Sequence, residues 1–167
     1  MANPEQRQTS ESGAAGQKWF IEDFAAGDRF TTMARTVTET DLVNYIGLSG
    51  FFEELFLNAP MAVAASVFKR RVVPGVLVLA LAEGLFSLTG RLNHGLAFLG
   101  FQNLEVKSPT AVGDTMSVEL EVKSIRLTRQ QGRGILEVGH VVRVDGGRIT
   151  MEYVSTRMLE SRGPSAG

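Results

Sequence analysis

The sequence predicts an α+β domain in which one antiparallel sheet curls around a single apolar helix. Residues 75–88 are apolar on nearly every side, and only a helix that is enclosed on most sides tolerates this composition. Four segments of strand length follow, at residues 96–106, 115–127, 134–144 and 148–159, each with partial alternation of apolar and polar side chains. One long helix followed by a run of antiparallel strands favours a sheet wrapped around that helix.

The segments before this helix predict shorter elements. Residues 28–37 alternate apolar and polar side chains, which favours a short strand. Thr38 and Asp41 have the spacing of a capping box, so we expect a helix over residues 38–48. A second short helix is predicted for residues 59–69, with a proline suited to its first turn.

The chain divides into one domain and two tails. Its 167 residues are close to the commonest domain size, and we assign a single domain to residues 18–162. Residues 1–17 are rich in Gln, Ser, Ala, Gly and Glu and contain no large apolar residue after Met1. Such a segment buries too little surface to offset chain entropy, so we expect a flexible tail there and another at residues 163–167.

The composition excludes several classes of function. The net charge is −1 and basic residues are spread among acidic ones, so neither nucleic acid nor a membrane surface is an expected partner. There is no cysteine, which excludes disulfides and thiolate chemistry, and we expect neither a metal ion nor a cofactor. The longest apolar run, residues 72–88, is interrupted by Pro74 and Glu83, and no secretory signal is recognisable. We therefore expect a cytoplasmic protein.

Seven short motifs follow one another along the chain: Phe20-Ile-Glu-Asp-Phe24, Gly27-Asp28, Arg35-Thr-Val-Thr-Glu39, Gly47-Leu-Ser-Gly50, Pro74-Gly75-Val-Leu, Gly95-Leu-Ala-Phe-Leu-Gly100 and Gly113-Asp114-Thr115. None is specific alone, but their order and spacing resemble the MaoC-like family of R-specific enoyl-CoA hydratases and dehydratases. The resemblance extends over most of the chain. It implies the hotdog fold, an acyl-CoA thioester whose coenzyme A belongs to the substrate, and a homodimer or a multiple of one.

The loop after Gly50 departs from the family pattern. Where the family continues with Asp-x-Asn-Pro-x-His, this chain has Phe51-Phe-Glu-Glu-Leu-Phe56. The resemblance places Phe51 and Phe56 at the two positions that handle water and proton, and a phenyl ring can neither accept nor donate a proton. Glu53 and Glu54 are the carboxylates in this loop and are the candidate catalytic residues, unless they are solvated surface side chains.

The remaining candidate residues would bind substrate. Phe51 and Phe56 either pack in the core or line the tunnel for the acyl chain. The resemblance implies that the backbone N–H groups of Gly75 and Val76 hold the thioester oxygen, where the helix dipole favours negative charge. The alternative is that Pro74 and Gly75 only begin a helix.

Charged residues near and within the apolar helix have two interpretations each. Lys69, Arg70 and Arg71 are candidates for the coenzyme A phosphates, or they form a solvated loop. Glu83 is either the helix carboxylate of a hotdog thioesterase or a paired acid. His140 lacks a partner at ligand spacing and is interpreted as structural.

Three functions fit these residues. The first is an acyl-CoA hydratase or dehydratase, acting on enoyl- or 3-hydroxyacyl-CoA through Glu53 or Glu54. The second is a non-catalytic acyl-CoA binding protein or a partner subunit of an active homologue with the intact motif. The third is a hotdog acyl-CoA thioesterase. The resemblance favours the first as a family assignment, and the missing Asp and His favour the second as behaviour, so turnover stays open.

Overall fold

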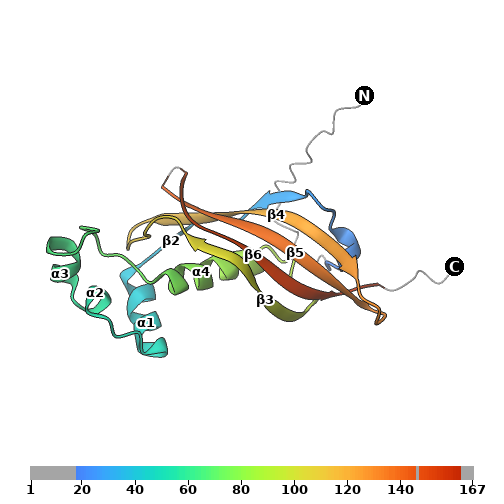
Figure 1. Cartoon of the computed structure of the whole chain (residues 1–167), viewed down its shortest axis with the longest axis horizontal. Coiled ribbons are helices and arrows are strands. Elements are labelled where there is room, and N and C mark those ends of the chain that lie inside the picture. The colour runs from blue at the N-terminus through green and yellow to red at the C-terminus, as the bar shows by residue number, and fades with distance from the viewer. Residues whose placement is uncertain (1–17, 146, 163–167) are drawn as a thin grey trace, which may run out of the picture.

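A computed structural model describes residues 18–145 and 147–162 as a helix laid against a sheet (Figure 1). The six strands are all antiparallel, in the order β1-β4-β5-β6-β3, with β2 also paired to β4. Both predicted tails lie outside the described residues. The strands are β1 (Arg29–Thr31), β2 (Arg35–Thr36), β3 (Gly95–Val106), β4 (Thr115–Leu127), β5 (Arg133–Val144) and β6 (Arg148–Glu160).

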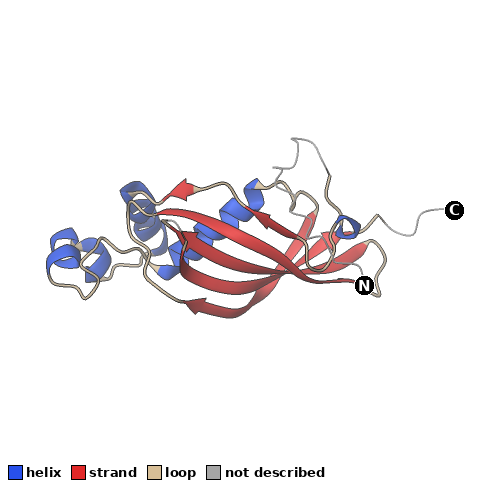
Figure 2. Ribbon diagram, turned by 90° about the horizontal axis from the view of Figure 1, so that it is seen from above, coloured by secondary structure: helices blue, strands red, loops and turns tan. Residues whose placement is uncertain are grey.

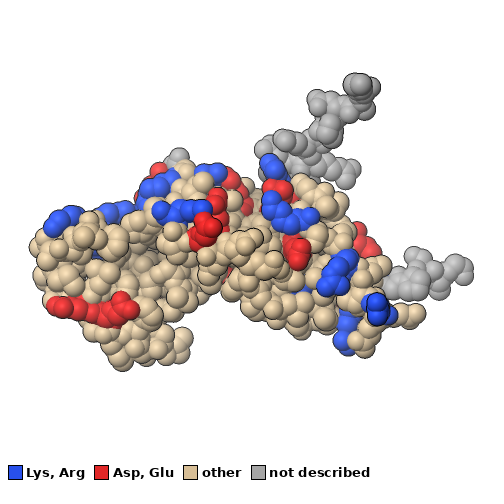
Figure 3. All heavy atoms as spheres, in the orientation of Figure 1, with Lys and Arg blue, Asp and Glu red and all other residues tan. Residues whose placement is uncertain are grey.

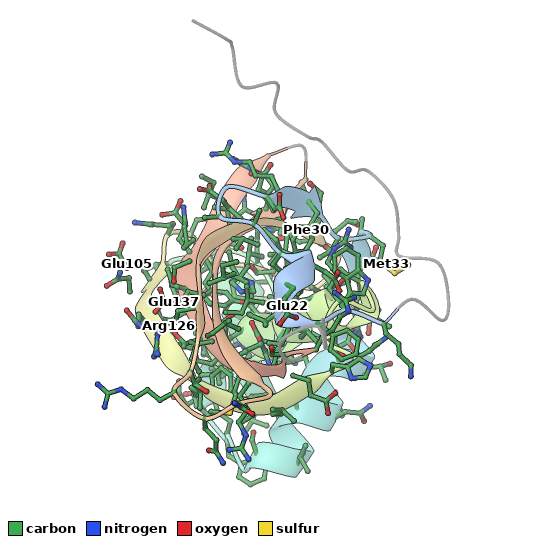
Figure 4. All side chains as sticks on the ribbon, turned by 90° about the vertical axis from the view of Figure 1, so that its right-hand side faces the viewer. Glu22, Phe30, Met33, Glu105, Arg126 and Glu137 are labelled. Atoms are coloured by element: carbon green, nitrogen blue, oxygen red, sulfur yellow. The ribbon has the colours of Figure 1, made fainter. Side chains whose placement is uncertain are left out.

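The long helix α4 (Gly75–Leu88) crosses the inner face of the curled sheet (Figure 2). Its inner side buries Leu77, Val78, Ala82, Leu85 and Phe86 against the sheet. Viewed along the long axis, the sheet bends around this side-chain-filled interior, and the labelled Glu105 lies on its outer side (Figure 4). The predicted α+β architecture of a sheet around one apolar helix is confirmed.

The opposite side of α4 is uncovered within the single chain. Val76 is 55% exposed and Leu88 is 70% exposed. The strand β3 lies at one edge of the sheet and pairs only with β6 among the described residues. The helix is thus enclosed on one face only.

The chain before α4 forms short helices, of which α2 (Glu54–Leu57) and α3 (Ala59–Ala64) lie beyond the end of the sheet (Figure 1). The helix α1 (Glu39–Ser49) begins as predicted, because Thr38 Oγ1 accepts from the Asp41 amide at 3.1 Å and the Asp41 carboxylate accepts from the Thr38 amide at 2.9 Å. A 3₁₀ turn, η1 (Ile21–Asp23), precedes the sheet.

Two of the predicted elements are shorter than expected. Residues 28–37 form two strands, β1 and β2, with three residues between them. The helix predicted for residues 59–69 ends at Ala64, where the hydroxyl of Ser66 bonds back to the carbonyl of Ala62 and competes with the backbone. Lys69 has a positive φ of 53°, which lies outside the right-handed helical region.

Candidate functional site

A cavity of about 310 Å³ lies at the N-terminal end of α4. Its walls come from the segment before α4, the first turn of α4, the ends of β3 and β6, and the turn that follows β3. Most of its lining is apolar. The lining residues are Leu55, Phe56, Phe68, Val72, Val73, Gly75, Val78, Val106, Lys107, Ser108, Pro109, Thr110, Thr150 and Met151.

The segment before α4 is fixed by hydrogen bonds to the turn after β3. The amide of Val73 donates to the carbonyl of Thr110 at 2.9 Å, and the amide of Val112 donates to the carbonyl of Arg71 at 2.9 Å. Val72 forms a β-bridge with Ala111. These contacts hold the start of α4 at a fixed place on the cavity wall.

A buried carboxylate strengthens this connection. Asp114 is 1% exposed and accepts hydrogen bonds from Arg70, from Arg148 at 3.0 Å and from the amide of Ala111 at 3.0 Å. Burial opposes its ionisation, but the hydrogen bonds from Arg70 and the Ala111 amide outweigh burial and hold the pKa of Asp114 below its usual value. Asp114 therefore remains a charged anchor at neutral pH.

Gly75, the first residue of α4, belongs to the cavity lining, whereas Val76 does not. The Pro74 carbonyl accepts from the amides of Leu77 at 3.0 Å and Val78 at 3.2 Å. The amides of Gly75 and Val76 precede these bonds and have no intrahelical acceptor, as at any helix start. A Cβ on Gly75 would lie 3.3 Å from Val106 Cγ2, so glycine keeps this wall of the cavity open. The helix dipole favours an electron-rich ligand oxygen here.

Of the two phenylalanines at the motif positions, Phe56 lines the cavity and Phe51 lies behind it. Phe56 is 7% exposed, and its ring centroid is 5.6 Å from that of Phe51. Phe51 in turn packs against Tyr45, with 6.4 Å between centroids. Phe56 therefore both packs in the core and faces the same cavity as Gly75, so the two interpretations of this residue are compatible.

Glu53 and Glu54 do not reach this cavity. Both are exposed, at the start of α2, and neither belongs to the cavity lining. Glu54 accepts a hydrogen bond from Asn58 Nδ2 at 3.2 Å. The geometry gives no support to the catalytic role expected for this pair, which stays a prediction.

The three basic residues before α4 have partners within the chain. Lys69 Nζ donates to the carbonyl of Ala64 at 2.7 Å, and Arg70 pairs with Asp114. Arg71 forms an ion pair with Glu39 at 2.8 Å, and its side chain is 15% exposed. Asp114, the partner of Arg70, belongs to the Gly-Asp-Thr motif at residues 113–115, but the motif alone does not reveal the pairing.

Glu83 is engaged in a polar cluster beneath the second half of α4. Its carboxylate accepts a hydrogen bond from Tyr153 Oη at 2.8 Å and pairs with Arg157. His140 approaches it to 3.8 Å and shares a 2.8 Å hydrogen bond with Ser155. Burial lowers the pKa of His140 to about 3, so this histidine is neutral and its contact with Glu83 is not an ion pair.

Two further hollows lie away from α4's first turn. One, of about 370 Å³, is bordered by Glu83, Ser87, Arg157 and the first residues of β3. The other, of about 760 Å³, involves strands β1, β3, β4, β5 and β6 and holds charges of both signs. On the face drawn in Figure 3, acidic and basic side chains likewise lie close to one another. Mixed charge of this kind gives neither hollow an evident preference for one ligand.

The described residues contain no group of three or more His, Asp or Glu side chains arranged to hold a metal ion. Within the same ranges, no helix has the length and apolar character needed to cross a membrane.

Two curated proteins are similar to this chain. Protein MaoC of Klebsiella aerogenes is 35% identical over 112 residues, which cover 67% of this chain and 33% of that protein. The (R)-specific enoyl-CoA hydratase of Aeromonas caviae is 35% identical over 88 residues, which cover 52% of this chain and 62% of the hydratase. The chain thus spans about a third of the first relative and less than two thirds of the second.

Solved structures share the fold. A Mycobacterium tuberculosis protein described as having a double hotdog fold superposes with a TM-score of 0.77 at 18% identity, covering 89% of this chain and 46% of that one. The hotdog fold predicted above is confirmed. Residues 23–144 match the family described as the MaoC like domain. This match covers most of the chain, and the chain therefore belongs to the MaoC-like domain family.

Proposed function

We propose that this domain binds enoyl- and 3-hydroxyacyl-CoA thioesters in the cavity at the start of α4. The observation that carries the proposal is an apolar cavity that contains both Phe56 and the first residue of α4. The acyl chain lies along Phe56, and the thioester oxygen accepts from the amides of Gly75 and Val76. The similarity to a hydratase named for enoyl-CoA supports this ligand class.

Within this proposal, the chain is a non-catalytic binder or a partner subunit of an active homologue. Hydration needs groups that take and give a proton close to the bound chain. The motif positions hold Phe51 and Phe56, and the exposed Glu53 and Glu54 lie outside the cavity lining. Hydrolysis through Glu83 has less support, because its carboxylate already accepts a hydrogen bond from Tyr153 and forms an ion pair with Arg157.

The coenzyme A phosphates are proposed to lie near Lys69, Arg70 and Arg71. Arg70 and Arg71 each face a carboxylate of the chain, whereas the ammonium of Lys69 meets a backbone carbonyl that carries no full charge. Lys69 is therefore the cation with most charge left for a phosphate. Lys69→Glu should weaken binding a few-fold at low salt and less at high salt, where exposed charges are screened.

The assembly is proposed to be a homodimer formed through β3 and the open side of α4. The edge strand β3 exposes apolar side chains over much of its length, and an unpaired edge of this kind is prone to pair with another strand. Two copies related by a two-fold axis would cover both surfaces. Sedimentation at micromolar concentration tests the proposal, and a monomer would contradict it. The exposed β3 residues are Leu96, Phe98, Leu99, Leu104 and Val106.

Titration calorimetry with butyryl-, crotonyl- and hexanoyl-CoA tests the binding proposal. Each buried methylene contributes about 0.8 kcal/mol, so two more carbons should tighten binding by roughly tenfold until the cavity is filled. Enoyl absorbance and free thiol, followed in the same samples, separate hydration from hydrolysis. Affinity that is independent of chain length, or absent for every ester, would show that this cavity is not an acyl-CoA site.

A further inference from the structure

We infer that the hairpin formed by β4 and β5 binds to an anionic lipid surface through its tip. The tip is defined as residues 123–133, which comprise the end of β4, the turn and the first residue of β5. This surface is separate from the cavity at the start of α4, so the inference does not rest on the proposed acyl-CoA function. It departs from the expectation, drawn from the net charge of the whole chain, that a membrane surface is not a partner.

The hairpin tip carries a local excess of positive charge. Residues 122–136 contain four basic side chains and no acidic one, although the whole chain has a net charge of −1. All four are exposed: Lys123, Arg126, Arg129 and Arg133. The turn lies at the end of the sheet opposite to α2 and α3 (Figure 1), and Figure 3 shows basic side chains at that end of the molecule. The net charge of the chain does not reveal this asymmetry.

The three arginines of the tip have no carboxylate partner among the described residues. Arg126 and Arg129 form no ion pair there, and Arg133 Nη1 donates to a neutral glutamine amide at 3.0 Å. Elsewhere on the sheet, Arg29 and Arg143 each pair with a glutamate of β4. The charges of the tip arginines are therefore available to an external anion.

Apolar side chains lie beside these cations. Leu127 is 65% exposed and Ile125 is 37% exposed. Successive side chains of a strand point to opposite faces, so these two residues share one face of β4 and Arg126 lies on the other. This combination suits the interface of an anionic bilayer, where an apolar side chain enters the acyl boundary and arginines stay at the phosphates.

Hydrogen bonds hold the tip in one conformation. The amide of Thr128 donates to the carbonyl of Arg133 at 3.0 Å, and its hydroxyl donates to the carbonyl of Gln130 at 2.7 Å. The amide of Ser161, which follows β6, donates to the carbonyl of Gly132 at 3.0 Å. The backbone is thus already ordered, which reduces the entropy lost when the tip binds a surface.

Two other anionic partners fit the tip less well. Residues 122–136 contain no aromatic side chain, whereas single-stranded nucleic acid is held largely by stacking of bases on aromatic rings. An interface with an acidic protein takes about 20–30 residues from each side, more than this tip contains. Neither partner gives the exposed Leu127 an apolar environment as directly as a bilayer does.

Vesicle flotation with the full chain tests the inference. The protein should bind vesicles that contain phosphatidylglycerol and should not bind vesicles of phosphatidylcholine alone. Each cation near an anionic surface contributes roughly fivefold to binding, so Arg126→Gln with Arg129→Gln should weaken it by about 25-fold. The matched control, Arg29→Gln with Arg143→Gln, loses the same charge from arginines that are already paired and should bind like the wild type.

A fluorescent label measures whether the tip enters the bilayer. The chain contains no cysteine, so Leu127→Cys provides a single site for an environment-sensitive dye. Its emission should shift to the blue and increase on adding anionic vesicles. The control is Val67→Cys, because Val67 is 88% exposed and lies near α3, at the opposite end of the molecule. Its label should not respond.

Four outcomes would overturn the inference. The first is the absence of wild-type binding to anionic vesicles, whatever the acyl-CoA titrations show. The second is an equal loss in the two double variants, which would mean that binding follows net charge alone. The third is a response of the Val67→Cys label without one at Leu127→Cys. The fourth is binding to single-stranded DNA or polyglutamate as strong as binding to vesicles, which would make the tip a general polyanion site.

Discussion

The hydroxyl of Tyr153 on β6 donates a hydrogen bond to the carboxylate of Glu83 on α4, with 2.8 Å between the two oxygens. Arg157, further along β6, pairs with the same carboxylate. The helix and the sheet are therefore joined by charge as well as by apolar packing. The side chains of Glu83 and Arg157 are only 17% and 18% exposed, so this pair is shielded from solvent.

Removing one partner of this pair should strongly destabilise the fold. Glu83→Ala leaves Arg157 buried without its counter-charge, and we expect the free energy of unfolding to fall by about 3 kcal/mol. The double variant Glu83→Met with Arg157→Met should recover most of this loss, since an apolar pair has no charge to desolvate. Urea unfolding measures both. A single variant as stable as the wild type would mean that the pair contributes nothing.

The free energy of unfolding should decrease at acid pH, because His140 is buried in its neutral form. Its folded pKa, lowered to about 3 by burial, lies below the ordinary value of 6.5, so below pH 6.5 the unfolded chain binds a proton that the folded chain does not. The contribution of neutral His140 to the free energy of unfolding is therefore complete above pH 6.5. It is lost progressively as the pH falls toward 3, at up to about 1.4 kcal/mol per pH unit. Glu83 lies 3.8 Å from the imidazole and the Tyr153 ring stacks on it, but neither raises the pKa of His140 above its ordinary value.

Urea titrations at several pH values between 4 and 7 check this prediction. The variant His140→Gln should show a shallower dependence, because carboxylates with lowered pKa values such as Asp41 and Asp114 still contribute to the acid slope. Ser155→Ala, which removes the hydrogen-bond partner but keeps the imidazole, serves as the control and should retain the steeper slope. Equal slopes in all three proteins would exclude His140 as their source.

Adding a methyl group at Gly75 should weaken ligand binding more than it affects the fold. The new Cβ of Gly75→Ala would lie 3.3 Å from Val106 Cγ2, inside the cavity wall. Gly84 belongs to the same helix, and a Cβ there would meet no heavy atom within 4 Å beyond the helix's own backbone, so Gly84→Ala is the matched control. We expect Gly84→Ala to raise stability by about 0.5–1 kcal/mol with unchanged affinity, and Gly75→Ala to lower crotonyl-CoA affinity several-fold. Equal affinities would place the ligand elsewhere.

Restoring the family's ionisable pair should produce hydration activity. Phe51→Asp with Phe56→His puts a carboxylate and an imidazole at the motif positions, and Phe56 already lines the cavity. We expect slow but measurable loss of crotonyl-CoA absorbance. The control pairs Phe56→His with Phe52→Asp, because Phe52 is 66% exposed and faces away from the core. Activity in both variants, or in neither, would contradict the proposed placement of the acyl chain.

Local sequence signals were sufficient for the long helix and the long strands. The apolar run at residues 75–88 has the same bounds as α4, and the predicted strand at residues 115–127 has the same bounds as β4. The capping box at Thr38 and Asp41 also forms as predicted. Periodicity and capping depend on residues that are close together in the sequence, so both can be recognised without knowledge of the fold.

The candidate site was less predictable because its contacts join distant segments. The partner of Arg70 is 44 residues away at Asp114, and Glu83 meets Arg157 across 74 residues. Thr110 belongs to a Pro-Thr-Ala-Val-Gly-Asp turn, where a small polar residue is typical of any loop. Nothing in that local pattern indicates that the residue is buried and lines the cavity.

Asp114 has a consequence for how the molecule opens. One carboxylate connects Arg70, in the segment before α4, with Arg148 at the beginning of β6. Local unfolding of the β5–β6 turn would therefore release one of the contacts that holds the cavity wall, and opening of that wall would loosen the turn. Amide hydrogens in the two segments should exchange with solvent as a single cooperative unit, although the segments lie far apart in the sequence.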